Sequence, residues 1–159
     1  MNNLKNYKKK QKTAIITGAS EGIGAAFSKL LIKKGWKVFG ISRSSIKLKA
    51  MSKSFKSNKQ SFKYFSCDVQ DFKKLKSIAK EIEAPDLLFL NAGIYSPVNA
   101  SEINLDLYKK HININYLGVL NSYEAFLPGL ISKQNGHIII MSSVSGLSLI
   151  HISEPTRRS

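Results

Sequence analysis

The chain has little of several residue types that mark particular classes of protein. Cys67 is its single cysteine, so no internal disulfide can form, and nothing in the cysteine content argues against a reducing compartment. No apolar run approaches the roughly 20 residues that a helix needs to cross a bilayer. The apolar run at residues 13–18 is also too short for the core of a signal peptide. We therefore expect a cytoplasmic protein that does not act in a membrane.

Acidic residues are scarce as well, and the resulting positive charge raises the question of a nucleic-acid partner. The chain carries 25 Lys+Arg against 10 Asp+Glu, a formal net charge of +15. Arginine, whose forked side chain reads bases and phosphates, occurs only at Arg43, Arg157 and Arg158. The other positive charges are lysines, several of them in residues 1–11. This pattern is typical of a disordered basic tail and a solvated surface, so we expect no nucleic-acid partner.

Short apolar segments alternate with amphipathic ones along the 159 residues, with no internal repeat and no sign of a second domain. Strands are predicted at residues 13–18, 36–42, 61–69, 86–93 and 136–143. Helices are predicted at residues 22–35, 45–56, 70–83 and 101–133. The first helix should bury an apolar stripe made of Ile23, Ala26, Phe27, Leu30 and Leu31.

Alternation of strands and helices predicts a parallel sheet with right-handed crossovers. The runs AIIT, LLFL and HIIIM are apolar on both faces, which is typical of strands covered by helices on both sides. The sequence therefore predicts one doubly wound α/β domain over residues 12–146.

The segment TGASEGIG, residues 17–24, lies between the first predicted strand and the first predicted helix. Gly18, Gly22 and Gly24 allow positive φ angles and a close approach of the backbone to a ligand. The start of the helix offers free N–H groups and the positive end of its dipole to a pyrophosphate. The segment therefore indicates a phosphate-binding turn of the dinucleotide-binding type.

This turn and four other motifs resemble the classical short-chain dehydrogenase/reductase family. The family's T-G-x-x-x-G-I-G is matched at residues 17–24, its D-V at 68–69 and its N-A-G at 91–93. Its N-x-x-G is matched at residues 115–118, and the S-S after its fifth strand at 142–143. The resemblance implies a Rossmann-like sheet with strand order 3-2-1-4-5, incomplete because the later strands of the family are missing. It also implies that the full-length parent is a homo-oligomer.

The resemblance assigns a role to each matched residue. The pyrophosphate would be held by the backbone of the glycine turn, at Gly18, Ser20, Glu21, Gly22, Ile23 and Gly24. Asp68 and Val69 would border the adenine, although Asp68 is equally suited to cap the next helix. The ribose next to the nicotinamide would be lined by Asn91, Ala92 and Gly93. Ser143, beside Ser142, would be the catalytic serine, and Asn115 would shape the active-site helix and a proton-relaying water.

The end of the second predicted strand bears on the choice of cofactor. NAD enzymes carry a carboxylate there for the ribose 2′-hydroxyl, whereas this chain has Ser42 followed by Arg43. An arginine can bind a 2′-phosphate through two parallel hydrogen bonds, so the sequence favours NADP over NAD. Glu21 in the glycine turn neither assists nor excludes a phosphate. The histidines and Cys67 show no metal-ligand spacing, and we expect no metal site.

The last residues depart from the family. Its catalytic tyrosine and lysine, in a Y-x-x-x-K pattern beyond the serine, have no counterpart in residues 144–159. Residues 147–157, LSLIHISEPTR, match the translation of a transposase-tagging sequencing adapter, so we expect residues 147–159 to be non-native. The sequence thus predicts an inactive fragment of an NADP-dependent oxidoreductase that acts on a carbonyl or alcohol substrate. The alternative is a non-catalytic dinucleotide-binding module.

Overall fold

The structure is a computed structural model, and it describes residues 10–55, 61–97 and 103–143. Within these residues, parallel strands form one sheet in the order β3-β2-β1-β4-β5. The strands are β1 (Thr13–Thr17), β2 (Lys37–Ser42), β3 (Phe62–Ser66), β4 (Leu87–Leu90) and β5 (His137–Ile140). The predicted doubly wound sheet and its strand order are confirmed.

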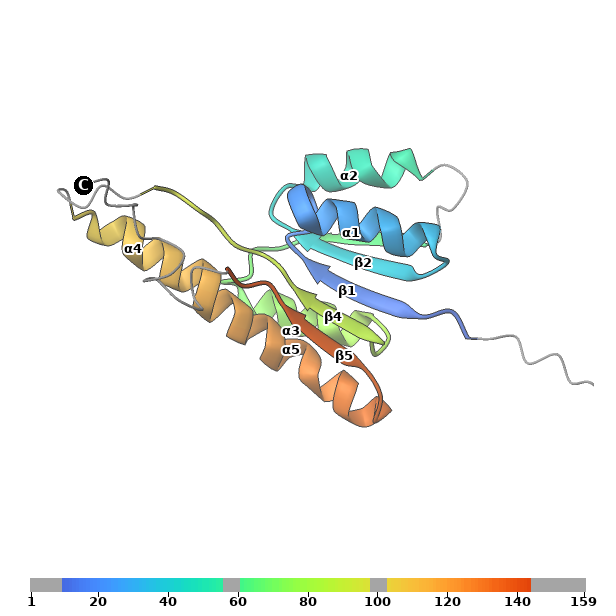
Figure 1. The fold of residues 1–159 in the computed structure, drawn as a ribbon. Coiled ribbons are helices and arrows are strands. Elements are labelled where there is room, and N and C mark those ends of the chain that lie inside the picture. The colour runs from blue at the N-terminus through green and yellow to red at the C-terminus, as the bar shows by residue number, and fades with distance from the viewer. Residues whose placement is uncertain (1–9, 56–60, 98–102, 144–159) are drawn as a thin grey trace, which may run out of the picture.

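Helices cover both faces of the sheet (Figure 1). One face carries α1 (Gly22–Lys33) and α2 (Ser45–Ser54), and the other carries α3 (Phe72–Glu81) and α5 (Gly118–Lys133). Each predicted helix is present, and its ends lie within a few residues of those expected.

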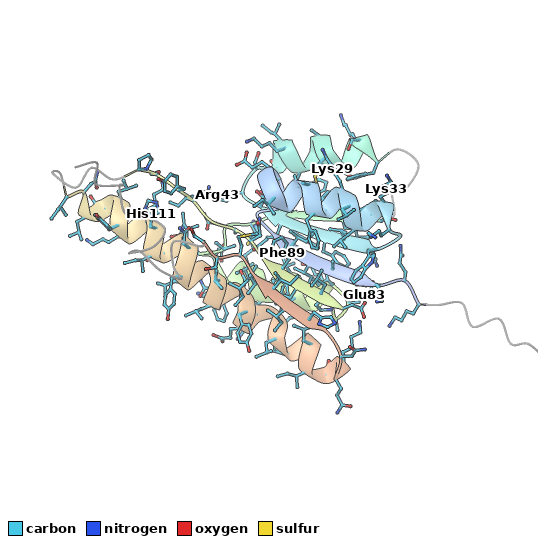
Figure 2. The ribbon with its side chains drawn as sticks, viewed as in Figure 1. Lys29, Lys33, Arg43, Glu83, Phe89 and His111 are labelled. Atoms are coloured by element: carbon cyan, nitrogen blue, oxygen red, sulfur yellow. The ribbon has the colours of Figure 1, made fainter. Side chains whose placement is uncertain are left out.

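The sheet separates two hydrophobic cores. Ile16 belongs to the core under α1 and α2, and its neighbour Ile15 belongs to the core under α3 and α5, as the two-residue period of a strand requires. Phe89 of β4, labelled in Figure 2, lies inside the fold. Its ring packs edge-on against that of Phe27 of α1, with ring centroids 5.2 Å apart. Both faces of β1 and β4 are buried, which explains their continuous apolar runs.

The buried face of α1 differs from the predicted stripe. Ile23 and Leu30 are 59% and 46% exposed, whereas Gly24 and Ser28 are buried. A Cβ atom at Gly24 would lie 2.3 Å from the carbonyl oxygen of Gly18, so the first turn of α1 packs directly on the glycine turn. The Ser28 hydroxyl donates to the Gly24 carbonyl at 2.7 Å and is thereby satisfied. Close packing of small residues, rather than apolar periodicity, sets the orientation of this helix.

The long helical region predicted at residues 101–133 is not uniform. It begins with α4 (Leu105–His111), because the side chain of Asn104 accepts a hydrogen bond from the Leu107 N–H at 3.0 Å and caps the helix. Between α4 and α5 lies a π-helical turn, η1 (Ile112–Leu117). Single π-helical turns are rare and frequent at functional sites.

Strand β5 departs from the expectation that helices cover both of its faces. Ile138, Ile139 and Ile140 are 38%, 42% and 54% exposed. In the described part of the chain, β5 pairs only with β4 and forms the edge of the sheet (Figure 1). The prediction of two covered faces holds for β1 and β4, whereas β5 is exposed at the edge of the described sheet, as the predicted lack of later strands implies.

Asp86, just before β4, joins three elements at the amino ends of the strands. Its Oδ2 accepts from the backbone N–H of Thr13 at 2.8 Å, and its Oδ1 lies 2.6 Å from Nζ of Lys133 at the end of α5. Both charged side chains are 24% exposed. Burial raises the pKa of Asp86, but the hydrogen bonds from Lys133 and from Thr13 outweigh burial, and the net pKa lies below its ordinary value.

Asp86→Asn should lower the free energy of unfolding at neutral pH by about 1–2 kcal/mol, because the Lys133 ammonium loses its counter-charge. Since the folded-state pKa is lowered, the stabilisation is complete above the unfolded-state value of 3.8 and is lost as the pH falls through the folded-state pKa. Urea unfolding between about pH 3 and pH 7 measures both effects. The matched control is Asp106→Asn, whose side chain is 97% exposed. Equal losses in the two variants would contradict the prediction.

Candidate functional site

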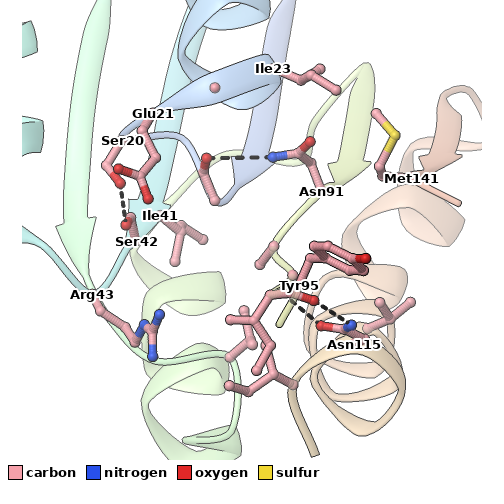
Figure 3. Close-up of a pocket in the computed structure, with 18 of the residues that line it drawn as sticks. Ser20, Glu21, Ile23, Ile41, Ser42, Arg43, Asn91, Tyr95, Asn115 and Met141 are labelled. Atoms are coloured by element: carbon pink, nitrogen blue, oxygen red, sulfur yellow. Dashed lines mark hydrogen bonds between the residues drawn. The ribbon is translucent and has the colours of Figure 1, made fainter. Parts of the chain in front are cut away.

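A cleft of about 690 Å³ lies at the carboxyl ends of the strands, where the strand order reverses between β1 and β4 (Figure 3). Such a reversal is where open α/β sheets bind ligands. Every predicted site residue except Gly24 lines this cleft. Those lining residues are Gly18, Ser20, Glu21, Gly22, Ile23, Ser42, Arg43, Asp68, Val69, Asn91, Ala92, Gly93, Asn115 and Ser143.

In the glycine turn, Gly18 packs closely against the segment after β4, whereas Gly22 faces open space. Gly18 has φ +66°, and a Cβ atom there would lie 2.9 Å from the Cα of Ala92. Gly22 has φ +54°, and a Cβ atom there would meet nothing within 4 Å. Glu21 is the residue before α1, and its side chain makes no capping hydrogen bond to the helix. The first N–H groups of α1 and the open space at Gly22 therefore fit the phosphates of a dinucleotide.

Thr17, at the end of β1, fixes the segment that follows β4. Its buried hydroxyl oxygen accepts from the backbone N–H groups of Asn91 and Ala92 at 2.9 and 3.0 Å. In return, Nδ2 of Asn91 donates to the carbonyls of Thr17 and Gly18 at 3.2 and 3.4 Å. The glycine turn and residues 91–93 are thus held together as one unit.

Asn115, in the π-helical turn, holds the next part of the same loop. Its Oδ1 accepts from the Ile94 N–H and its Nδ2 donates to the Ile94 carbonyl, both at 2.8 Å. His111 adds a second attachment, because its Nε2 accepts from the Ser96 N–H at 3.2 Å while its Nδ1 lies 2.8 Å from the Leu107 carbonyl. The helical region therefore positions the loop that follows β4. The sequence interpretation assigned no such role to His111.

Val69 is positioned by two residues of α5. A Cβ atom at Gly118 would lie 2.5 Å from Cγ2 of Val69, so only glycine allows this approach. Nδ2 of Asn121 donates to the Val69 carbonyl at 3.0 Å. Asn121 was not predicted from the sequence. The one feature that could have indicated it is that it is a polar residue inside an apolar helical pattern.

Asp68 does not cap the following helix. The cap of α3 is Asp71, whose Oδ1 accepts from the Lys74 N–H at 3.0 Å. Asp68 instead accepts from the Gln70 N–H at 2.9 Å. The alternative interpretation of Asp68 as a helix cap is therefore wrong, since helix α3 begins one turn later than that interpretation requires.

At the far end of the cleft, charged groups gather at the end of β2. Oγ atoms of Ser20 and Ser42 are 2.7 Å apart, and Arg43 follows on the same strand end (Figure 3). The carboxylate of Glu21 forms an ion pair with Lys47, in the first turn of α2. The hydrogen bond and charge of Lys47, with a smaller contribution from Arg43, hold the pKa of Glu21 below its usual value.

At the opposite end of the cleft, the carboxyl end of β5 supplies Met141, Ser142 and Ser143. Tyr95, whose ring is 86% exposed, comes from the loop after β4. Residues 144–159, and with them the expected non-native segment at 147–159, lie outside the described residues.

Within residues 10–55, 61–97 and 103–143, no three His, Cys, Asp or Glu side chains come close enough to hold a metal ion. Over the same residues, no helix has both the length and the apolar character that a membrane crossing requires.

Known proteins share both this sequence and this fold. A family model described as short chain dehydrogenase matches residues 12–153. The chain belongs to that family. An oxidoreductase of Listeria monocytogenes described as uncharacterized is 42% identical over 142 residues, which are 87% of this chain and 57% of the relative.

More distant relatives carry oxidoreductase names. Oxidoreductase UcpA of Salmonella typhimurium is 32% identical over 85% of the chain and 52% of its own length. The very-long-chain 3-oxoacyl-CoA reductase of Coccidioides immitis is 31% identical over 91% of the chain and 44% of its own length. This short-chain dehydrogenase sequence spans about half the length of the curated relatives it matches. In fold it is similar to serine dehydrogenase of Escherichia coli, with a TM-score of 0.78 at 23% identity over 86% of this chain and 64% of the other.

Thr17→Val should destabilise the protein by about 1–3 kcal/mol, because the N–H groups of Asn91 and Ala92 lose their acceptor. Thr17→Ser is the matched control, since it keeps the oxygen and should retain most of the stability. Urea unfolding of the two variants and the parent chain measures the difference. If valine and serine gave equal stability, the hydroxyl would not be the group that joins β1 to residues 91 and 92.

Cys67 should resist thiol reagents although it lines the cleft. Burial raises its pKa to about 11, with Asp71 and Asp68 adding to the shift and Lys74 opposing it. At pH 8 the thiolate fraction is then about 0.1%, and the residue is only 3% exposed. Absorbance assays with an aromatic disulfide should show slow labelling of the folded chain that accelerates with rising pH, and fast labelling in urea. Labelling of the folded chain as fast as in urea would contradict this.

Proposed function

We propose that the complete protein transfers a hydride between NADP(H) and a carbonyl or alcohol substrate, and that this chain is its cofactor-binding part. The observation that carries the proposal is one continuous cleft that runs from the glycine turn to Ser143. Relatives whose names describe oxidoreductases and a 3-oxoacyl-CoA reductase support the reaction class. The absence of a membrane-spanning helix from the described residues is compatible with the cytoplasmic location that we propose.

The cofactor would be held by the chain's own backbone and side chains. The turn at Gly18–Gly22 and the uncapped start of α1 would bind the pyrophosphate. Asp68 and Val69 would border the adenine, and the segment from Asn91 to Gly93 would line the ribose near the nicotinamide. When bound, the nicotinamide supplies or accepts the hydride.

Two side chains would act on the substrate end. Ser143 would donate a hydrogen bond to the substrate oxygen and stabilise the charge that develops there. Asn115 would act by positioning the loop after β4, because the oxygen and the nitrogen of its side-chain amide are both hydrogen-bonded to the backbone of Ile94.

A proton donor is the missing component. Residues 144–159 contain neither tyrosine nor lysine, so the family's acid–base pair has no candidate after Ser143. We propose that this chain binds the cofactor without turnover, that residues 147–159 are non-native, and that the parent enzyme, a homo-oligomer, carries the pair beyond Gly146. A dinucleotide-binding module without catalysis is the second candidate, favoured by the same lack of tyrosine and lysine.

The 159-residue chain should bind NADPH and convert no ketone or alcohol. Fluorescence titration of NADPH and an absorbance assay at the nicotinamide band measure the two properties. Gly22→Asp should abolish binding, because it places a negative charge in the open phosphate site without a clash. The control is Gly35→Asp, since Gly35 also has a positive φ, +81°, and open space but lies outside the cleft. Loss of binding in both variants, or no binding by the parent chain, would contradict cofactor binding at this turn.

Sequencing of the source gene through the codon of Gly146 tests the second part of the proposal. An open frame that continues into Y-x-x-x-K is the expected result, and that complete enzyme should oxidise NADPH with a carbonyl substrate. A genomic reading of LSLIHISEPTRRS followed by a stop would overturn the hydride-transfer proposal and support the non-catalytic module.

A further inference from the structure

An ion pair joins Glu21, which lines the cleft, to Lys47, which lies outside the cleft lining, and their two elements are not neighbours in sequence. Glu21 belongs to the glycine turn and directly precedes α1, whereas Lys47 lies in the first turn of α2. The side chains are 70% and 55% exposed, respectively. An ion pair so open to water adds little to the stability of the fold, so a ligand can separate it at small cost.

Glu21 shares the cleft lining with Ser42 and Arg43, the two residues expected at the 2′-position of the adenosine ribose. Ser20 and Ser42 share a hydrogen bond of 2.7 Å, and Figure 3 shows Glu21 beside them at the end of β2. Arg43 lines the same cleft, and its charge makes a small contribution to the lowered pKa of Glu21. The ion pair with Lys47 is the contact that Glu21 makes with a cation in the described residues.

The backbone of Lys47 is fixed while its side chain has only this one partner among the described residues. Its N–H donates to the Ser44 hydroxyl at 3.3 Å, which caps α2. Its ammonium group binds the carboxylate of Glu21. In the described structure, that carboxylate is the anion that Lys47 binds.

We propose that Lys47 determines cofactor specificity together with Arg43, and that the Glu21 carboxylate occupies Lys47 until a 2′-phosphate replaces it. The proposal rests on the proposed function, because it requires an adenosine ribose at this end of the cleft. A phosphate monoester carries a charge of about −2 at neutral pH and three acceptor oxygens, against one negative charge on Glu21. It therefore competes well for two cations. NADH carries no such group and leaves the pair intact.

Titration of the 159-residue chain with NADPH and NADH tests the proposal. Lys47→Gln should weaken NADPH binding about tenfold, the loss of one charge-assisted contact, and change NADH binding less than about twofold. Glu21→Gln should strengthen NADPH binding about threefold by releasing Lys47. The same Glu21→Gln change in the Lys47→Gln background should give a smaller gain, because most of its effect comes from releasing Lys47.

The matched control is Lys49→Gln, which removes the same charge from an exposed residue two positions along α2. It should change the binding of either dinucleotide less than about twofold. Circular dichroism checks that each variant folds.

Three results would overturn the proposal while leaving the proposed function intact. One is a Lys47→Gln effect on NADPH no larger than that of Lys49→Gln. Another is a Glu21→Gln gain that is as large without Lys47 as with it. The third is a loss of NADH affinity in Glu21→Gln, which would assign the carboxylate to the ribose diol of NAD. Failure of the parent chain to bind either dinucleotide would instead overturn the proposed function and this inference with it.

Discussion

The cleft depends on one side-chain oxygen, the hydroxyl of Thr17. It accepts from two successive N–H groups, those of Asn91 and Ala92, and so ties the end of β1 to the segment after β4. These strands are adjacent where the strand order reverses, so this contact sets the separation of the two loops that face the ligand. Gly18 and Gly24 then pack at distances that leave no room for a side chain. The conformation of the glycine turn and the spacing of the ends of β1 and β4 are therefore fixed by the same contacts.

The opposite wall is built by polar residues within an otherwise apolar helical region. Asn115 and His111 bind the backbone of the loop after β4, and Asn121 binds the backbone of Val69. Gly118 lets the helix approach Val69 closely. The π-helical turn lies in the middle of this group, between α4 and α5. Val69 and the loop after β4, which both line the cleft, are thus positioned by one helical region.

Most of this architecture follows from the sequence, and the exceptions depend on contacts that apolar periodicity does not report. Strands and helices were predictable because apolar runs and amphipathic stretches alternate, and the motif residues reach the cleft because they follow strand ends. The exposure of Ile23 was not predictable, because close packing of Gly24 orients α1. The partnership of Glu21 with Lys47 was also hidden, since it joins residues 26 positions apart that only the crossover through β2 brings together. The apolar periodicity of a sequence indicates which residues are shielded from water, but it does not indicate which small residues are in contact.

The exposed strand β5 has a practical consequence for every solution measurement on this chain. In the described residues, its outer edge offers unpaired backbone donors and acceptors, flanked by the exposed side chains of Ile138, Ile139 and Ile140. Native sheets normally protect such an edge, because it is a template for another strand. In the described part of the chain, this edge is therefore where a further strand could pair, and dilute samples guard solution measurements against such pairing between copies.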